Sequence, residues 1–311
     1  MSGAPASLIY ELHGLRIRSD IPLGEPTLEG AYDLAVSWVG TRVEPDTAER
    51  RVLAEAVWPG GTGYRHVETS AGFRLEFRGV CDIFVAADRG SLTVALARGA
   101  DPDMVPILLK GNVLAMLFLL AGEGVLHASA AACGGDAVAF LGHSGAGKST
   151  LVTLCCAAGA ELVTDDVLRV RADESGFRCA SGGSDVRLRP AASPLTALFP
   201  GRPSQATVDG RLAVRLRNRA SFWTRLAAVV TPVRTRSPRL RIERLGPVAA
   251  WQVLMEAPRV LGIRDQELLR SQFETSRRLA QGIPVYRAEI PHGPPFDPSL
   301  GAELLSGIGL T

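Results

Sequence analysis

Residues 142–150 read GHSGAGKST, and this stretch is the one that predicts the fold. It fits the pattern G-x-x-x-x-G-K-[ST], in which glycines allow consecutive backbone N–H groups to point at phosphates. In that pattern the lysine reaches the β- and γ-phosphates, and the hydroxyl that follows reaches Mg²⁺. The candidate nucleotide-binding residues are therefore Gly142, His143, Ser144, Gly145, Ala146, Gly147, Lys148, Ser149 and Thr150.

The use of lysine in this chain supports the same interpretation. Of 311 residues, 34 are Lys or Arg, and only Lys110 and Lys148 are lysine. A guanidinium is planar, forked and bulkier than an ammonium, so arginine is no equivalent among crowded phosphates. One of two lysines standing at the position that needs a slim cation favours a functional motif.

The residues on either side predict the strand and the helix that such a loop requires. Residues 137–141 form a short apolar run that is typical of a buried strand. Residues 149–158 carry apolar side chains at helical spacing and are followed by Gly159, a residue suited to a helix C-terminus. A glycine-rich turn without a ligand is the alternative, and the strand–loop–helix context favours nucleotide binding over it.

A pair of carboxylates follows the predicted helix. Residues 162–166 read LVTDD, which predicts an apolar strand that ends in Asp165 and Asp166. Phosphoryl transfer needs one carboxylate for Mg²⁺ and another group to orient or deprotonate the acceptor hydroxyl. A helix N-cap or a turn is the alternative. The position of the pair, one strand after the loop and helix, favours the catalytic interpretation.

His127 stands upstream of the loop, in the sequence VLHAS at residues 125–129. An imidazole near Asp165 would keep that carboxylate ionised or hold it in position. The spacing alone leaves an alternative equally open, in which His127 is a buried residue bonded to the backbone.

The two halves of the chain differ in pattern. Residues 1–102 are predicted to form a β-rich N-terminal domain, and residues 103–311 an α/β catalytic domain that begins with a nearly all-apolar helix over 103–122. The expected strands of the first half are 8–12, 15–18, 32–36, 73–77 and 92–96. In the second half, a strand is expected over 212–216, a helix over 265–281 and a final strand over 285–290.

Composition limits the class of protein and its partners. The chain is 46% hydrophobic and 21% charged, which is typical of globular proteins, and its net charge of +2 argues against nucleic acid or an anionic membrane as a partner. The five cysteines include no CxxC pair, as expected for reduced thiols in a cytosol. The longest apolar run, 113–121, is too short to span a membrane. We expect a soluble cytoplasmic protein.

Taken together, residues 126–128, 142–150 and 162–166 resemble the HPr kinase/phosphorylase family, and its HPr kinase-like branch most of all. The resemblance covers about residues 103–290. It implies a P-loop kinase core related to phosphoenolpyruvate carboxykinase, use of ATP and Mg²⁺, and phosphorylation of a serine on a protein or peptide. It also implies roles for four residues: Asp165 as general base with His127 as its partner, and Asp166 and Ser149 as Mg²⁺ contacts. Family members of the longer type are homo-oligomers.

The sequence also departs from the family. The glycine-rich Glu-x-Arg-Gly-x-Gly signature of the bifunctional members is missing, and residues 185–190 read DVRLRP in that region. This puts reverse phosphorolysis, and HPr as the substrate, in doubt. The branch includes kinases that phosphorylate a C-terminal serine of lasso peptide precursors, and such a ribosomally made peptide is the leading substrate class.

Arg187 and Arg189 lie within this divergent stretch. They alternate along a predicted strand and so share a face, where they would bind a phosphate or a substrate carboxylate. A solvated strand face is an alternative that is at least as well supported.

Two other functions stay open at this stage. The first is a nucleotide-binding regulator or scaffold without efficient transfer, against which the second carboxylate argues. The second is an NTPase or a small-molecule kinase built on the same core.

Overall fold

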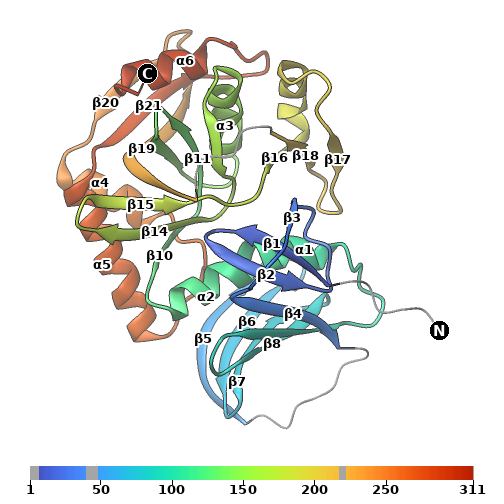
Figure 1. Ribbon diagram of the computed structural model, residues 1–311. Helices are drawn as coiled ribbons and strands as arrows, with labels where there is room; N and C mark the ends of the chain where they lie inside the picture. Colours follow the sequence, from blue (N-terminus) through green and yellow to red (C-terminus); the bar gives the residue numbers. More distant parts are fainter. Residues whose placement is uncertain (1–6, 40–47, 217–221, 311) are drawn as a thin grey trace. The chain divides into compact units, whose positions relative to one another are not determined.

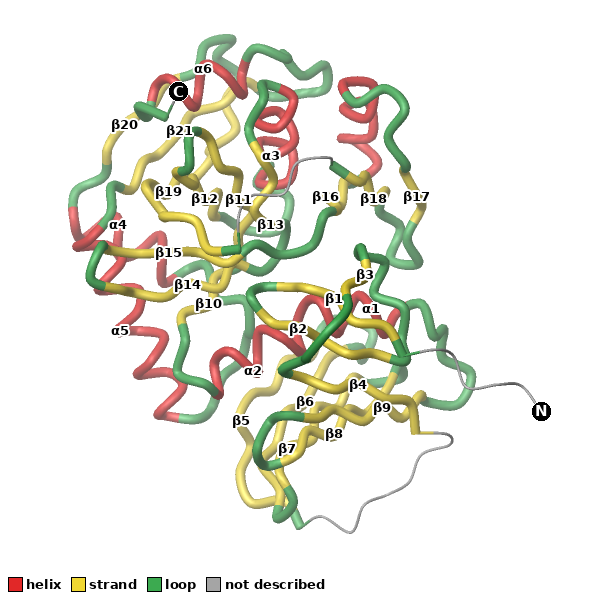
Figure 2. Tube along the Cα trace, viewed as in Figure 1, coloured by secondary structure: helices red, strands yellow, loops and turns green. Residues whose placement is uncertain are grey.

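The structure is a computed structural model that describes residues 7–39, 48–216 and 222–310. The chain divides into two compact units (Figure 1). The first comprises Met1–Gly122 and Val260–Ser271, and the second comprises Glu123–Arg259 and Gln272–Thr311. Each unit combines strands with helices (Figure 2), so the predicted mixed α/β class is confirmed at that level.

The first unit is built on a nine-stranded sheet in the order β3-β1-β2-β4-β9-β8-β7-β6-β5. The sheet is mixed: β4 pairs in parallel with β2 and with β9, and the other neighbouring strands are antiparallel. Several of its strands alternate buried with more exposed residues, as expected when one face of a sheet is packed and the other is solvated. The strands are β1 (Leu8–Leu12), β2 (Leu15–Ser19), β3 (Thr27–Leu28), β4 (Leu34–Val39), β5 (Glu49–Val57), β6 (Gly63–Thr69), β7 (Gly72–Phe77), β8 (Cys81–Ala86) and β9 (Ser91–Leu96).

The helical segment predicted over 103–122 belongs to this first unit. It consists of α1 (Met104–Leu108), a π-helical turn (Leu109–Val113) and α2 (Leu114–Leu120). His66 of β6 binds the Asn112 side chain, with Nε2 and Oδ1 2.6 Å apart, and Lys110 forms an ion pair with Glu25 at 3.3 Å.

The predicted boundary between residues 102 and 103 therefore differs from the observed one, which follows Gly122. The physical reason is that an all-apolar helix must be buried, and its sequence does not say against which sheet.

The second unit has a central sheet in the order β10-β14-β15-β19-β12-β11-β13, with β21 also paired to β19 and β20 paired to β21. A separate three-stranded sheet runs in the order β16-β18-β17. The strands are β10 (Gly124–Leu126), β11 (Ala128–Cys133), β12 (Asp136–Leu141), β13 (Glu161–Thr164), β14 (Leu168–Asp173), β15 (Gly176–Ala180), β16 (Asp185–Leu188), β17 (Ser204–Ala206), β18 (Leu212–Arg215), β19 (Trp223–Thr235), β20 (Arg241–Arg244) and β21 (Val285–Pro291).

Both faces of this central sheet are buried. Val138 and Phe140 pack in one apolar cluster with residues of α3 (Lys148–Ala157) and α6 (Leu300–Gly307). The alternate residues of β12, such as Ala139, pack in another cluster with residues of α4 (Pro247–Met255) and α5 (Gln266–Gly282). Burial on both sides explains why β12 is a continuous apolar run and not an alternating one.

The strands β13, β12, β19 and β21, which surround the glycine-rich loop, run in the same direction. β12 pairs in parallel with β19, and β19 with β21. β11 is antiparallel to both β12 and β13, so β13 also runs parallel to β12. The carboxyl ends of all four strands meet at one edge, which is where open α/β sheets bind ligands.

Some elements were not expected from the sequence. The predicted strand over 32–36 begins at Leu34, and the region after 290, for which no element was predicted, contains α6. The long strand β19 and the helix α4 were also missed. Among the described residues, no helix has the length and apolar content needed to span a membrane.

Candidate active site

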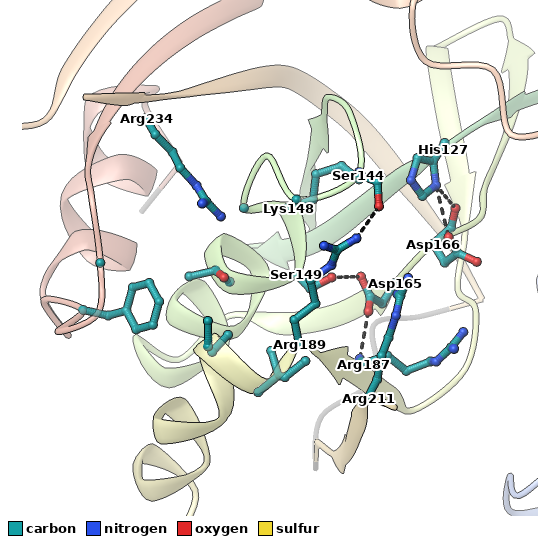
Figure 3. Close-up of a pocket in the computed structure, with 18 residues that line it drawn as sticks. His127, Ser144, Lys148, Ser149, Asp165, Asp166, Arg187, Arg189, Arg211 and Arg234 are labelled. Atoms are coloured by element: carbon teal, nitrogen blue, oxygen red, sulfur yellow. Dashed lines mark hydrogen bonds and ion pairs between the residues drawn. The ribbon is translucent and has the colours of Figure 1, made fainter. Parts of the chain in front are cut away.

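The carboxyl edge of the central sheet carries a cavity of about 240 Å³ (Figure 3). It is lined by residues of the glycine-rich loop together with both aspartates of the predicted pair, and by four arginines. These groups come from segments up to 169 residues apart in the chain, from His127 to Phe296.

The glycine-rich loop has the local structure that its sequence predicts. β12 ends at Leu141 and α3 begins at Lys148, so strand and helix flank the loop on the expected sides. Gly147 caps the helix with φ of 105°, a left-handed conformation that side chains with a Cβ disfavour. The N-terminus of α3 therefore opens directly into the cavity, where unpaired backbone N–H groups and the helix dipole favour an anion.

Not every residue of the loop lines the cavity. Ser144, Gly145, Gly147, Ser149 and Thr150 do, together with Lys148. Gly142, His143 and Ala146 are absent from the lining, and they shape the loop through the backbone, as when the Ala146 N–H donates to the His143 carbonyl at 3.0 Å.

Lys148 lies in the cavity with only 7% of its surface exposed. Its ammonium donates to the carbonyl oxygens of Gly142 at 2.7 Å and His143 at 3.2 Å. Burial lowers the pKa of this amine, while the charges of Asp165 and Asp166 act in the opposite direction. The nearby carboxylates thus help to keep a buried cation charged.

Asp165 follows β13 and is held by three donors. The hydroxyls of Ser129 and Ser149 donate to its Oδ1 at 2.5 and 2.9 Å, and the backbone N–H of Arg187 donates to its Oδ2 at 2.9 Å. β11, α3 and β16 each supply one of these donors. This carboxylate therefore joins the glycine-rich loop to the three-stranded sheet.

Asp166 has a different set of partners. His127 Nδ1 lies 3.1 Å from its Oδ1, and Arg259 Nη2 donates to its Oδ2 at 2.7 Å. Burial raises the pKa of this carboxyl, but the charge of Arg259 and the contact with His127 outweigh it and hold the pKa well below the usual range. Asp166 also has φ of 92°. Strain of this kind in a residue other than glycine is concentrated at functional sites.

Two expected pairings are exchanged in the structure. His127 was expected to be the partner of Asp165 and contacts Asp166 instead; Ser149 was expected to act with Asp166 and contacts Asp165 instead. The reason lies in the sheet. His127 precedes β11, and its backbone N–H donates to the Ala257 carbonyl at 2.8 Å. This hydrogen bond places the imidazole near Arg259 and Asp166.

Arg187 and Arg189 both line the cavity, although only Arg187 belongs to strand β16. The guanidinium of Arg189 donates to Ser144 of the glycine-rich loop at 2.7 Å. Arg187 forms an ion pair with Asp209, which also faces Arg211 at 3.4 Å. Both arginines thus lie at the site, one against the loop and one beside Asp165.

Sequence reasoning missed five residues of this region. Ser129 and Arg259 bind the aspartates directly, while the side chains of Arg211, Arg234 and Phe296 line the cavity. Ser129 stands next to His127 in a segment already singled out, so its position was a usable signal. Arg211 and Arg234 lie in the arginine-rich stretch 211–244, whose composition is compatible with docking an acidic peptide but marks no single residue. Arg259 and Phe296 lie in stretches with no motif.

The oxygen atoms near the loop include groups that could hold Mg²⁺. Among the described residues no group of three or more His, Cys, Asp and Glu side chains is placed to hold a metal ion. Mg²⁺ usually takes one or two carboxylates, phosphate oxygens and water. Ser149 and the two aspartates supply that kind of oxygen set beside the loop.

Comparisons with known proteins do not assign this chain to a family. Neither protein-family models nor curated proteins match this chain. Among solved structures, the HPr(Ser) kinase/phosphatase from Coxiella burnetii is 14% identical to it over 58% of this chain and 91% of that one, with a TM-score of 0.29. A likeness at that TM-score carries no argument about the present chain.

Proposed function

We propose that this protein is an ATP- and Mg²⁺-dependent phosphotransferase that phosphorylates a serine hydroxyl of a peptide or protein. One observation carries the proposal: the hydroxyl of Ser149, at the start of α3, lies 2.9 Å from Asp165 at the end of β13. Phosphoryl transfer in P-loop proteins uses a loop hydroxyl and a strand-end aspartate on the same Mg²⁺.

The loop would bind the phosphates and neutralise their charge. Loop residues and the first turn of α3 line the cavity, where their backbone N–H groups would bind phosphate oxygens. Lys148 would exchange its contacts with two loop carbonyls for contacts with phosphate oxygens, to which an ammonium binds more strongly. Bound Mg²⁺ would supply further positive charge on the transferred group.

The resemblance implied that Asp165 is the general base and Asp166 a Mg²⁺ contact. The contacts of the two aspartates favour the opposite assignment. Asp165 shares the Ser149 hydroxyl, which supports it as the carboxylate on the magnesium side. Asp166, held by His127 and Arg259, would orient the acceptor hydroxyl. A fixed carboxylate is useful in that role, because positioning and charge stabilisation provide most of the rate in phosphoryl transfer.

The acceptor is proposed on the resemblance of the motifs and on the charge of the cavity. Arginines flank the aspartates, and an acceptor that carries acidic groups would complement them. A ribosomally made precursor peptide with a serine is the class we favour. A homo-oligomer is part of the same proposal.

The experiment is incubation of serine-containing precursor peptides with ATP and Mg²⁺, followed by mass spectrometry for a gained phosphate. Asp165→Asn and Asp166→Asn are compared with Asp173→Asn, an exposed aspartate in the β14–β15 hairpin that serves as the matched control. We expect transfer to persist in the control and to fall at least about 100-fold in both site variants.

Magnesium dependence separates the two roles. Asp165→Asn should raise the Mg²⁺ concentration needed for half-maximal nucleotide binding, whereas Asp166→Asn should leave binding intact and abolish transfer. The opposite result would restore the roles implied by the family resemblance. ATP hydrolysis by the wild type with no transfer to any peptide would favour an NTPase instead.

A further inference from the structure

The parallel strands place three segments in order along one edge of the central sheet. β12 leads into the glycine-rich loop, β19 ends beyond Arg234, and β21 leads to Gly293 and Phe296. Neighbouring strands lie about 4.8 Å apart, so the segment after β21 stands roughly 10 Å from the loop. β13 and its aspartates lie on the other side of the loop.

This order gives the cavity two ends. Asp165 and Asp166 mark the end where a phosphoryl group would leave, and Arg234 lies on the opposite side of Lys148 (Figure 3). A nucleotide whose terminal phosphate faces the aspartates must therefore extend its nucleoside toward β19 and β21.

Among the described residues that line the cavity, Phe296 is the one Phe, Tyr or Trp side chain, and packing against the core fixes its position. Its ring packs against the apolar cluster under α3 and α6 and is partly buried. The ring also lies directly over Gly293, so closely that a Cβ at position 293 would overlap it. A glycine at this position lets the phenyl ring lie across the segment after β21.

The cavity lining also includes two small apolar residues. Ala191 and Ala192, in the 3₁₀ segment Pro190–Leu198, line the cavity together with Phe296. Arg234 stands at the same end and brings a positive charge. These lining residues, called the slot below, offer an aromatic ring, methyl groups and one cation.

We propose that this slot binds the base of the nucleotide, with the heterocycle stacked on Phe296 and Arg234 near the α- and β-phosphates. The proposal rests on the nucleotide-dependent function proposed above. The described residues of the cavity lining include no Asn, Gln or Glu side chain that would read a base edge. We expect the slot to bind the flat face of the base, which adenine and guanine share.

The experiment compares ligands with and without a base. Binding of the β,γ-imido analogues of ATP and GTP and of inorganic tripolyphosphate, each with Mg²⁺, is measured by calorimetry. The variants are Phe296→Ala, Phe296→Trp and Gly293→Ala. The matched control is Phe273→Ala, which removes a phenyl ring from α5 outside the cavity. The side chain of Phe273 is 45% exposed. Thermal unfolding of each variant checks that it is folded.

Base–aromatic stacking predicts that Phe296→Ala weakens both nucleotide analogues about 5- to 150-fold. Tripolyphosphate should bind the variant as tightly as it binds the wild type, to within about two-fold. Phe296→Trp should retain nucleotide affinity, and Gly293→Ala should lose it because the added methyl displaces the ring.

Three results would overturn the inference: equal loss for nucleotide and tripolyphosphate in Phe296→Ala, no loss for either, or a wild type that binds tripolyphosphate as tightly as the nucleotides. A wild type that binds none of the three ligands would overturn the proposed function as well. A preference of more than about ten-fold between the ATP and GTP analogues would show that the base edge is read.

Discussion

Protonation of His66 is predicted to destabilise the first unit at mildly acidic pH. The side chain is fully buried, and its Nε2 lies 2.6 Å from Asn112 Oδ1. Burial lowers the pKa of His66 from 6.5 to about 4, although hydrogen bonds to Asn112 and to the backbone of Arg65 act in the opposite direction. An uncharged imidazole is therefore part of the folded unit.

The sign and size of the effect follow from proton linkage. Between pH 6.5 and 4 the unfolded chain binds a proton at this position and the folded chain does not, so stability rises with pH in that window. The stability that the uncharged His66 gives to the folded unit is fully present above pH 6.5 and is lost as the pH falls toward 4. A difference of about 2.5 pKa units corresponds to about 3 kcal/mol in total, of which about 2 kcal/mol is lost between pH 7.5 and 5.

The assay is urea unfolding at several pH values, with a short hydrogen–deuterium exchange pulse at one fixed pH and mass spectrometry of peptides from β6 and β7. This reports on the first unit alone, which matters because a protein with two units need not unfold in one step. His66→Gln should remove about 2 kcal/mol of the pH dependence, whatever its own cost. His292→Gln, at an exposed position, is the control. Identical pH dependence in the wild type and His66→Gln would refute the reasoning.

Two further predictions concern the second unit and the cysteines. Arg259→Met removes the guanidinium that binds Asp166 and should lower the free energy of unfolding by about 1–3 kcal/mol in urea titrations. That cost should shrink in an Asp166→Asn background, and an unchanged cost would show that the two side chains are not coupled. Burial raises the pKa of Cys81 and of Cys179 to about 12, so both thiols should resist iodoacetamide at pH 8 until urea unfolds the chain. Rapid labelling of either one in the folded protein, seen by peptide mass spectrometry, would contradict their burial.

The local part of the site was predictable because neighbouring residues build it. A strand, a turn that needs glycine and a helix N-terminus are adjacent in residues 136–157, and backbone geometry alone brings Lys148 and Ser149 to the mouth of the loop. The paired aspartates were also predictable, since an apolar strand leads to a sheet edge and polar residues at its end face outward. The apolar run, the glycines and the acidic pair follow one another in the sequence, so each can be recognised from its neighbours.

The partners of each carboxylate were decided only by the tertiary structure. Asp165 and Asp166 are adjacent and chemically identical, and the strand pairing turns one toward Ser149 and the other toward His127 and Arg259. Arg259 is 93 residues from its aspartate, and no local pattern marks it.

The same holds for the far end of the cavity and for the limits of the two units. Phe296 reaches the site because β21 pairs with β19 and β19 with β12, a register set by long-range packing. The helical segment that joins the halves has an apolar surface that either unit would satisfy, and only the fold shows that Asn112 meets His66. Sequence determines which residues are able to do the chemistry here; long-range pairing of strands decides which of them meet.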